Sequence, residues 1–229
     1  MTASFSRSVS ATLLSFAIVS APVGAAPKRA KPAPAKAASL PPRLYDIRGF
    51  KLEMPLEDFR KSANPDWPQA KVVCNGDTDE GKKYAPYVSD EETKRGIRKC
   101  VWWQTGSYSG VVGLALGPMG TMQYEFSFVK DPIDSVDRLY SYFATIKAFA
   151  FGEILELLTE KYGKPAMVAG SVQNGLGAKF DSREAMWANS LSILNAKERW
   201  LSVDQMAIML TSNRLLKVAE PGPAKKNAV

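Results

Sequence analysis

The stretch TMQYEFSFVKD, residues 121–131, carries the clearest structural signal in the chain. Large apolar side chains recur at every second position, at Met122, Tyr124, Phe126 and Phe128. This period places the four side chains on one face of a β-strand. The stretch therefore predicts a strand with one face in the core and the other facing outward.

Two helices are predicted on either side of this strand. Residues 151–162 (FGEILELLTEKY) carry one apolar stripe, and Gly163 and Pro165 are typical of the residues that follow a helix end. A shorter helix is expected after Pro55, where Leu56 and Phe59 stand three positions apart among charged residues. The stripe of the longer helix comprises Phe151, Ile154, Leu155, Leu158 and Tyr162.

The remaining apolar runs have the composition of strands. Residues 136–149 are interpreted as a strand that runs into a helix, and residues 171–180 as a loop around Asn174 and Gly175. Residues 184–194, 198–203 and 205–212 are interpreted as closing strands. The order strand, helix, strands occurs twice. It predicts an α+β fold of antiparallel sheets with two helices, and it suggests two related halves.

The N-terminus has the three parts of a secretory signal peptide: Arg7, the apolar residues 11–20, and small residues before residue 27. We expect a signal peptide over residues 1–25, a periplasmic or secreted location, and no transmembrane helix after cleavage. Residues 26–43 and 217–229 are rich in Pro, Ala and Lys. They are predicted to be a disordered tether and a disordered tail around one α+β domain, residues 44–216.

The formal net charge of +7 comes from the ends of the chain. Residues 44–216 contain 21 basic and 22 acidic residues, so the predicted domain is almost neutral. Nucleic-acid binding needs clustered Lys and Arg on a folded face, and it is therefore not expected. The basic tails allow weak contact with anionic surfaces.

Cys74 and Cys100 are the two cysteines of the chain, each at the end of an apolar run. In an exported protein, two cysteines most simply form a disulfide. This bond would join the two predicted strands at the positions where the charged insert between them, residues 75–99, begins and ends. Within the insert, Ser89 and Glu92 are spaced as a capping box for one helical turn, which Gly96 would end.

The residue types present exclude several chemistries. The chain has no histidine, so Ser-His-Asp and Cys-His catalytic sites are excluded and a zinc site is not expected. A calcium alternative would depend on Asp77, Asp79 and Glu80, which lack the register of the regular calcium loop. No catalytic, cofactor-binding or metal-binding residue is therefore predicted.

Aromatic residues in and beside the insert are the candidate interface. Trp102 and Trp103 are adjacent on a predicted strand, so their side chains point to opposite faces. One is expected in the core and the other at the surface, near Tyr84 and Tyr87. Exposed Trp and Tyr are favoured anchors of protein interfaces.

Two stretches resemble known exported bacterial proteins. IRGFKLEMPLEDFRKSA, residues 47–63, is similar to a GxxLGM-like opening of many exported and mostly uncharacterised proteins, with Glu53 in place of the second glycine. ILELLTEKYGKP, residues 154–165, is similar to an L…KYGxP helix end of some of them. More distantly, the chain resembles the SmpA/OmlA-type outer-membrane assembly lipoproteins and the β-lactamase inhibitor proteins. The resemblance implies an α+β binding module and carries over no catalytic residue.

The function expected from these observations is a non-enzymatic envelope protein that acts by protein–protein contact, with a periplasmic or envelope protein as its partner. Two alternatives stay open. One is a periplasmic carrier or sensor of a small apolar ligand, held between the sheet and the helix of residues 151–162. The other is a cell-wall hydrolase that uses a pair of carboxylates, although no spacing singles out such a pair.

Overall fold

The computed structural model describes residues 42–77, 83–106, 109–117 and 119–220. The predicted signal peptide, residues 26–41 of the predicted tether and residues 221–229 of the predicted tail lie outside these residues. Two of the acids in the calcium alternative, Asp79 and Glu80, also lie outside them.

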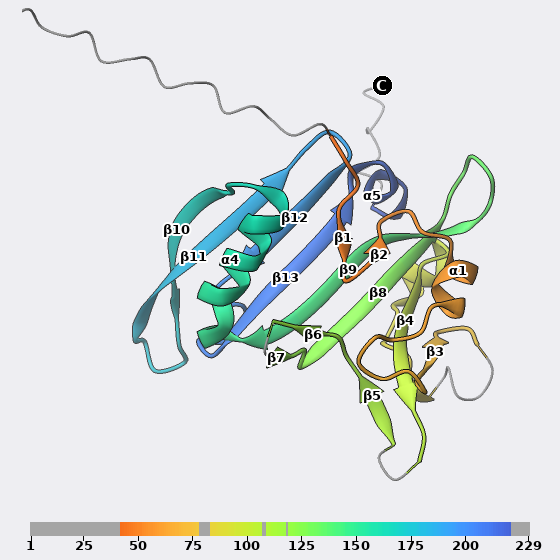
Figure 1. The fold of residues 1–229 in the computed structure, drawn as a ribbon, viewed down its shortest axis with the longest axis horizontal. Helices are drawn as coiled ribbons and strands as arrows, with labels where there is room; N and C mark the ends of the chain where they lie inside the picture. Colours follow the sequence, from red (N-terminus) through yellow and green to blue (C-terminus); the bar gives the residue numbers. More distant parts are fainter. Residues whose placement is uncertain (1–41, 78–82, 107–108, 118, 221–229) are drawn as a thin grey trace, which may run out of the picture. The chain divides into compact units, whose positions relative to one another are not determined.

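One antiparallel sheet dominates the described residues (Figure 1). Its strands follow the order β10-β11-β12-β13-β9-β8-β4-β3, and β5 pairs with β4 beside this path. The bounds are β3 (Lys71–Cys74), β4 (Arg98–Gln104), β5 (Gly110–Val112), β8 (Gln123–Lys130), β9 (Asp137–Lys147), β10 (Ala166–Gln173), β11 (Lys179–Ala188), β12 (Ser192–Lys197) and β13 (Gln205–Ser212).

Helices and two small hairpins complete the fold. The helices whose bounds fall within the described residues are α1 (Leu56–Lys61), α3 (Asp90–Lys94), α4 (Phe151–Tyr162) and α5 (Asn213–Ala219), and the 3-10 turn η1 (Ala148–Ala150) leads into α4. The hairpins are β1 (Asp46–Ile47) with β2 (Phe50–Lys51), and β6 (Ala115–Leu116) with β7 (Met119–Gly120). The predicted α+β class with antiparallel sheets is confirmed.

The core lies on one face of the sheet, under α1, α4 and the β1–β2 hairpin (Figure 1). The alternation predicted for β8 is confirmed for Tyr124, Phe126 and Phe128, which are all buried. Met122 precedes the strand and is exposed instead. Phe59 of α1 lies against Phe126, with 4.6 Å between the ring centroids, so α1 packs directly on the central strands.

The predicted helices and the predicted helical turn are all present. Ile154, Leu158 and Tyr162 of α4 are buried, whereas Leu155 is half-buried. In α3, the Ser89 side chain accepts a hydrogen bond from the Glu92 backbone N–H, and the Glu92 carboxylate accepts one from the Ser89 backbone N–H. This reciprocal pair is the capping box that the sequence predicts.

Helix α5 is absent from the sequence predictions. It packs on the other face of the sheet, where Leu215 and Ala219 contact the buried side chains of Val129 and Tyr140. Lys217, Val218 and Ala219 therefore belong to a helix and not to a disordered tail. At the other end, the Arg43 carbonyl accepts hydrogen bonds from the side chains of Asn189 and Ser192, so Arg43 belongs to the folded part.

Three strand predictions need correction. Residues 171–173 and 179–180 are not loop, because they continue β10 and β11 on either side of a turn at residues 174–178. The run 184–194 breaks at Asn189 into β11 and β12. Residues 198–203 form a connection that carries only one isolated bridge, between Trp200 and Ser202.

The repeated order of elements has a counterpart in the sheet. β3, at one edge of the sheet, is the first strand of the sheet after α1. β10, at the other edge, is the first strand after α4. From each edge, the following strands of the path step toward the centre of the sheet, where β8 and β9 pair. The two expected halves thus meet within a single sheet.

Glu53 adopts a left-handed backbone conformation, with φ +67°. Glycine adopts this conformation at little cost, whereas other residues are strained in it. The Glu53 carboxylate accepts hydrogen bonds from Arg214 Nη2 at 2.7 Å and from Ser212 Oγ at 2.7 Å. The side chain therefore joins the turn before α1 to the start of α5, and these contacts offset the strain.

We expect Glu53→Ala to destabilise the protein more than Glu53→Gly, by about 1 kcal/mol. Both variants lose the contacts to Arg214 and Ser212, but only alanine keeps the strained backbone. The free energy of unfolding, measured by denaturant titration, separates the two variants. Equal stability of the alanine and glycine variants would contradict the strain at this position.

Candidate functional site

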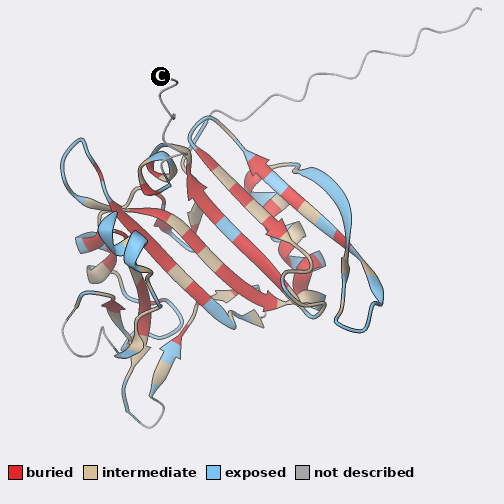
Figure 2. Ribbon diagram, turned by 180° about the vertical axis from the view of Figure 1, so that it is seen from behind, coloured by how far each residue is buried: buried red, intermediate tan, exposed pale blue. Residues whose placement is uncertain are grey.

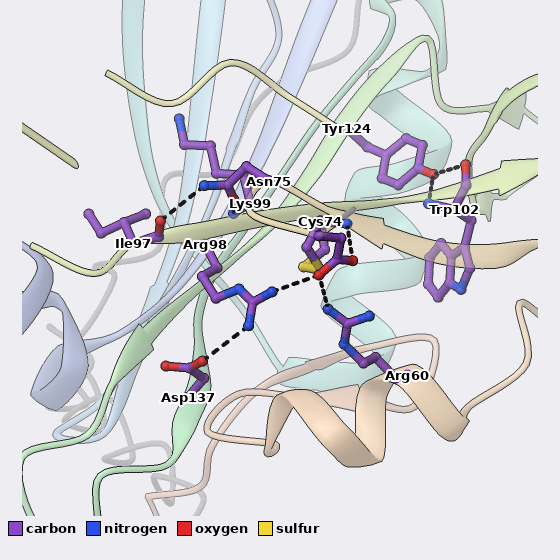
Figure 3. The surroundings of a disulfide bond; sticks show 11 residues. Arg60, Cys74, Asn75, Ile97, Arg98, Lys99, Trp102, Tyr124 and Asp137 are labelled. Carbon is purple, nitrogen blue, oxygen red and sulfur yellow. Dashed lines mark hydrogen bonds and ion pairs between the residues drawn. A yellow bond between two sulfur atoms is a disulfide. The ribbon is translucent and has the colours of Figure 1, made fainter. Parts of the chain in front are cut away.

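Trp102 is removed from the candidate interface because it lies wholly within the core. Its ring centroid is 5.0 Å from those of Phe50, Phe59 and Phe126. Its backbone N–H donates to the Tyr124 hydroxyl at 2.7 Å (Figure 3). Trp102 is thus the tryptophan expected in the core.

Trp103 points to the opposite face of the sheet and is half-buried. The ring of Tyr84 stacks on it, with 3.5 Å between the centroids and 16° between the planes. Tyr87 is 83% exposed. Tyr84 and Trp103 therefore form a stacked pair, and Tyr87 leaves a large aromatic surface in solvent.

A second group of apolar side chains lies on the same face as Trp103. We call it the open face: the face of the sheet opposite to α1 and α4. Figure 2 shows that α3 and α5 lie over one end of this face, while no described helix crosses the middle of β9, β13, β12 and β11. One cross-strand row runs over this middle part through Ala166, Met186, Asn195, Met209, Phe143 and Glu125.

Two methionines of this row are partly exposed on a face where antiparallel sheets commonly carry polar side chains. Met209 is 40% exposed and Met186 is 38% exposed. Phe143 is half-buried because Trp200 lies beside it, with 6.2 Å between the ring centroids. The three apolar side chains Met186, Met209 and Phe143 are called the apolar strip; Asn195 lies between the two methionines, and its side-chain amide donates to Glu184 at 2.6 Å.

The connection from β12 to β13, residues 198–204, brings Trp200 to the open face beside Phe143, and it exposes the next residue, Leu201. The Trp200 backbone N–H donates to the Gln205 carbonyl at 2.7 Å, and Lys197 Nζ lies 5.5 Å from the centre of the Trp200 ring. The next residue, Leu201, is 93% exposed and has φ +57°. A bulky side chain in this conformation is uncommon, so the turn holds Leu201 outward at a cost in backbone energy.

Sequence reasoning missed this site because its members are far apart in the chain. Phe143, Met186 and Met209 become neighbours only through the register of β9, β13, β12 and β11. The run ERWLSV has the composition of a strand, which concealed the turn at Leu201. A local signal does exist, because Met186 and Met209 stand at the outward positions of their strands.

The predicted disulfide between Cys74 and Cys100 is present, and it joins directly opposite residues of β3 and β4. Asp77 is hydrogen-bonded to the Cys74 backbone and pairs with Arg60 and Arg98, two arginines of different elements that Figure 3 labels beside the disulfide. Asp77 Oδ1 accepts from Arg60 and from Arg98, each at 2.7 Å, and Oδ2 accepts from the Cys74 backbone N–H at 3.0 Å. Asp77 is therefore engaged by protein donors on both oxygens.

A cleft of about 250 Å³ lies on the core side of the sheet, beside α4. Ile154, Leu157 and Leu158 of α4 form one wall, and Ile47, Leu116 and Ile208 face them. Lys161 Nζ pairs with Asp46 Oδ1 at 2.5 Å among the lining residues. The cleft is mostly apolar and lies where the small-ligand alternative expects a site.

The described residues hold no group of three or more Cys, Asp or Glu side chains placed to bind a metal ion. Within the same residues, no helix is long and apolar enough to span a bilayer. Comparison of the chain with protein-family models, curated proteins and solved structures finds no match. The resemblances in the sequence therefore stay predictions.

Replacing both cysteines, Cys74→Ala and Cys100→Ala, should lower the free energy of unfolding by about 3 kcal/mol. The bond closes a loop with a sequence separation of 26 residues, so its loss gives the unfolded chain more freedom. Denaturant titration of the oxidised wild type, the reduced wild type and the double variant measures this effect. Equal stability of the three forms would contradict a structural role for the bond.

Burial alone would raise the pKa of Asp77, but hydrogen bonds from Arg60 and Cys74 and the charges of Arg60 and Arg98 hold the pKa below its ordinary 3.8. A lowered pKa in the folded state gives stability that is present above pH 3.8 and is lost as the pH falls through the folded-state pKa. Asp77→Asn removes this contribution.

We therefore expect Asp77→Asn to cost about 2 kcal/mol of stability at pH 7, and less as the pH falls below 3.8. Unfolding curves of the wild type and the variant between pH 7 and pH 3 measure the difference. Asp181→Asn, at an exposed carboxylate of β11, is the matched control and should change stability little. A cost at Asp77 that does not change with pH would contradict the ion pairs.

Proposed function

We propose that this chain is an exported, non-enzymatic binding module that holds a protein partner of the cell envelope on its open face. One observation carries the proposal: Met186, Met209 and Leu201 are exposed on or beside a sheet face whose centre no described helix covers. Such exposed apolar surface on a folded domain favours an interaction site.

The chemistry of the open face favours a protein as its partner. Methionine side chains are flexible and polarisable, so they adapt to an apolar partner surface. Trp200 is a large, half-buried ring of the kind that anchors interfaces, and Leu201 projects beside it. Charges such as Glu125 and Lys197 stand at the margin of the apolar strip, where a polar rim is expected.

The predicted leader and the disulfide support an exported location. Disulfides form and persist in oxidising compartments such as the periplasm. The Tyr84–Trp103 pair lies on the same side of the sheet as the apolar strip, so it can extend the contact area toward β4. The proposed interface therefore keeps Tyr84, Tyr87 and Trp103 and replaces Trp102 by Met186, Met209 and Leu201.

The cleft beside α4 favours a second candidate, a carrier or sensor of a small apolar ligand. Its volume of about 250 Å³ would admit a short acyl or aromatic group. It opens on the opposite side of the sheet from the apolar strip. The two candidates therefore predict contacts at different side chains.

Site-specific photo-crosslinking in the native periplasm distinguishes these candidates. A photoreactive amino acid replaces Met209, Leu201, Leu157 or Ile133, one at a time, in the chain expressed with its leader. We expect one recurrent protein adduct at Met209 and Leu201, and none at Ile133, an 80% exposed apolar residue in the connection between β8 and β9. Met209→Lys should reduce the adduct at Leu201 about tenfold, because it buries a charge in the interface.

Two results would contradict the proposed protein partner. One is equal labelling of the same protein at Ile133 and Met209, which indicates random collision. The other is a low-mass apolar adduct at Leu157 without protein adducts on the open face, which supports the small-ligand candidate.

A further inference from the structure

Strand β10 is an edge of the sheet, and its eight residues AMVAGSVQ contain no charge and no proline. Seven of the eight are exposed, and Val172 is half-buried. Natural edge strands are usually short, charged, bulged or covered, because unpaired backbone groups recruit other strands. β10 shows none of these protections along its length.

The strand at the opposite edge of the sheet, β3, differs from β10 in its length and in its charge. β3 has four residues, begins with Lys71, and is held to β4 by the Cys74–Cys100 bond. One edge is therefore short and charged, while the other is long and neutral. This difference singles out β10 as a pairing edge.

The hydrogen bonds of the β10–β11 hairpin show which backbone groups are unpaired. The Asn174 N–H donates to the Ala178 carbonyl at 3.0 Å, so residues 174 and 178 form a hydrogen-bonded pair. Such pairs alternate along an antiparallel ladder. The N–H and C=O groups of Met167, Ala169, Ser171 and Gln173 therefore point away from β11.

We propose that β10 pairs in antiparallel orientation with β10 of a second copy of this chain. A two-fold axis at Gly170 sets Met167 opposite Gln173 of the second copy, and Ala169 opposite its Ser171. Every outward N–H and C=O group then finds a partner. Val168 lies opposite Val172 of the second copy, a β-branched pair that favours strand pairing.

Strand chemistry favours a second copy over the other segments of the chain. A two-fold pairing of a neutral strand sets no like charges opposite each other. The predicted tether contains Pro27, Pro32, Pro34 and Pro41, which cannot donate to a ladder. The axis lies perpendicular to the sheet, so the open faces of both copies lie on the same side.

The register is tested by Gly170→Cys, which sets two thiols opposite each other across the axis. An added Cβ at Gly170 meets only the Ser182 carbonyl oxygen, at 3.9 Å, so the side chain fits. Directly opposite cysteines are bridged elsewhere in this sheet, at Cys74 and Cys100, with Cα atoms 4.1 Å apart. We expect a disulfide-linked dimer to form at least about tenfold faster than for Leu176→Cys.

Leu176→Cys is the matched control because this hairpin residue is 95% exposed but is not opposite itself in the proposed register. Equal crosslinking rates for the two cysteine variants would overturn the proposed pairing. Circular dichroism confirms that both variants fold.

A second experiment measures the dimer without a cysteine. Ala169→Pro removes an outward N–H but no bond to β11, so the monomer should fold and the dimer dissociation constant should rise at least about tenfold in sedimentation velocity. Ala169→Thr keeps the N–H and should retain the dimer. A wild-type protein that stays monomeric over the concentrations used for crosslinking, or a dimer that Ala169→Pro leaves unchanged, would overturn the proposal.

Discussion

The packing of Phe50 and Phe59 against Trp102 and Phe126 decides which face of the sheet becomes the core. These rings bind the β2 strand and α1 to β4 and β8, and α4 adds its apolar stripe to the same cluster. Side chains alternate along every strand. Once Trp102 is inside, Trp103 must face outward, and so must Phe143, because its neighbours Tyr142 and Ala144 are buried in the core.

The packing of the core therefore determines which side chains lie on the open face, and this face carries the proposed recognition surface. α5 and Ile97 cover only one end of it, where Leu215 and Ile97 pack with Val129 and Tyr140 of the sheet. The remaining part bears methionine and aromatic side chains where many antiparallel sheets carry polar ones. No described helix crosses the centre of this face, and the strained turn at Leu201 adds an exposed apolar side chain beside it.

Features with a local physical signal could be predicted from the sequence. The alternation of β8, the stripe of α4, the capping box of Ser89 and Glu92, and the paired cysteines all depend on residues close in the chain or on composition. Strand β10 could not be predicted, because both of its faces are exposed and its sequence does not alternate. Likewise, the left-handed turn at Glu53 depends on Arg214, 161 residues away.

The bond between Cys74 and Cys100 also changes what a protease can do to this protein. It closes the insert at its base, where β3 and β4 pair residue by residue. A single cut within residues 75–99 would therefore leave two fragments that remain covalently joined and paired in the sheet. Loss of the insert would require two cuts, so a single nick within it does not lead to dissociation of the fragments.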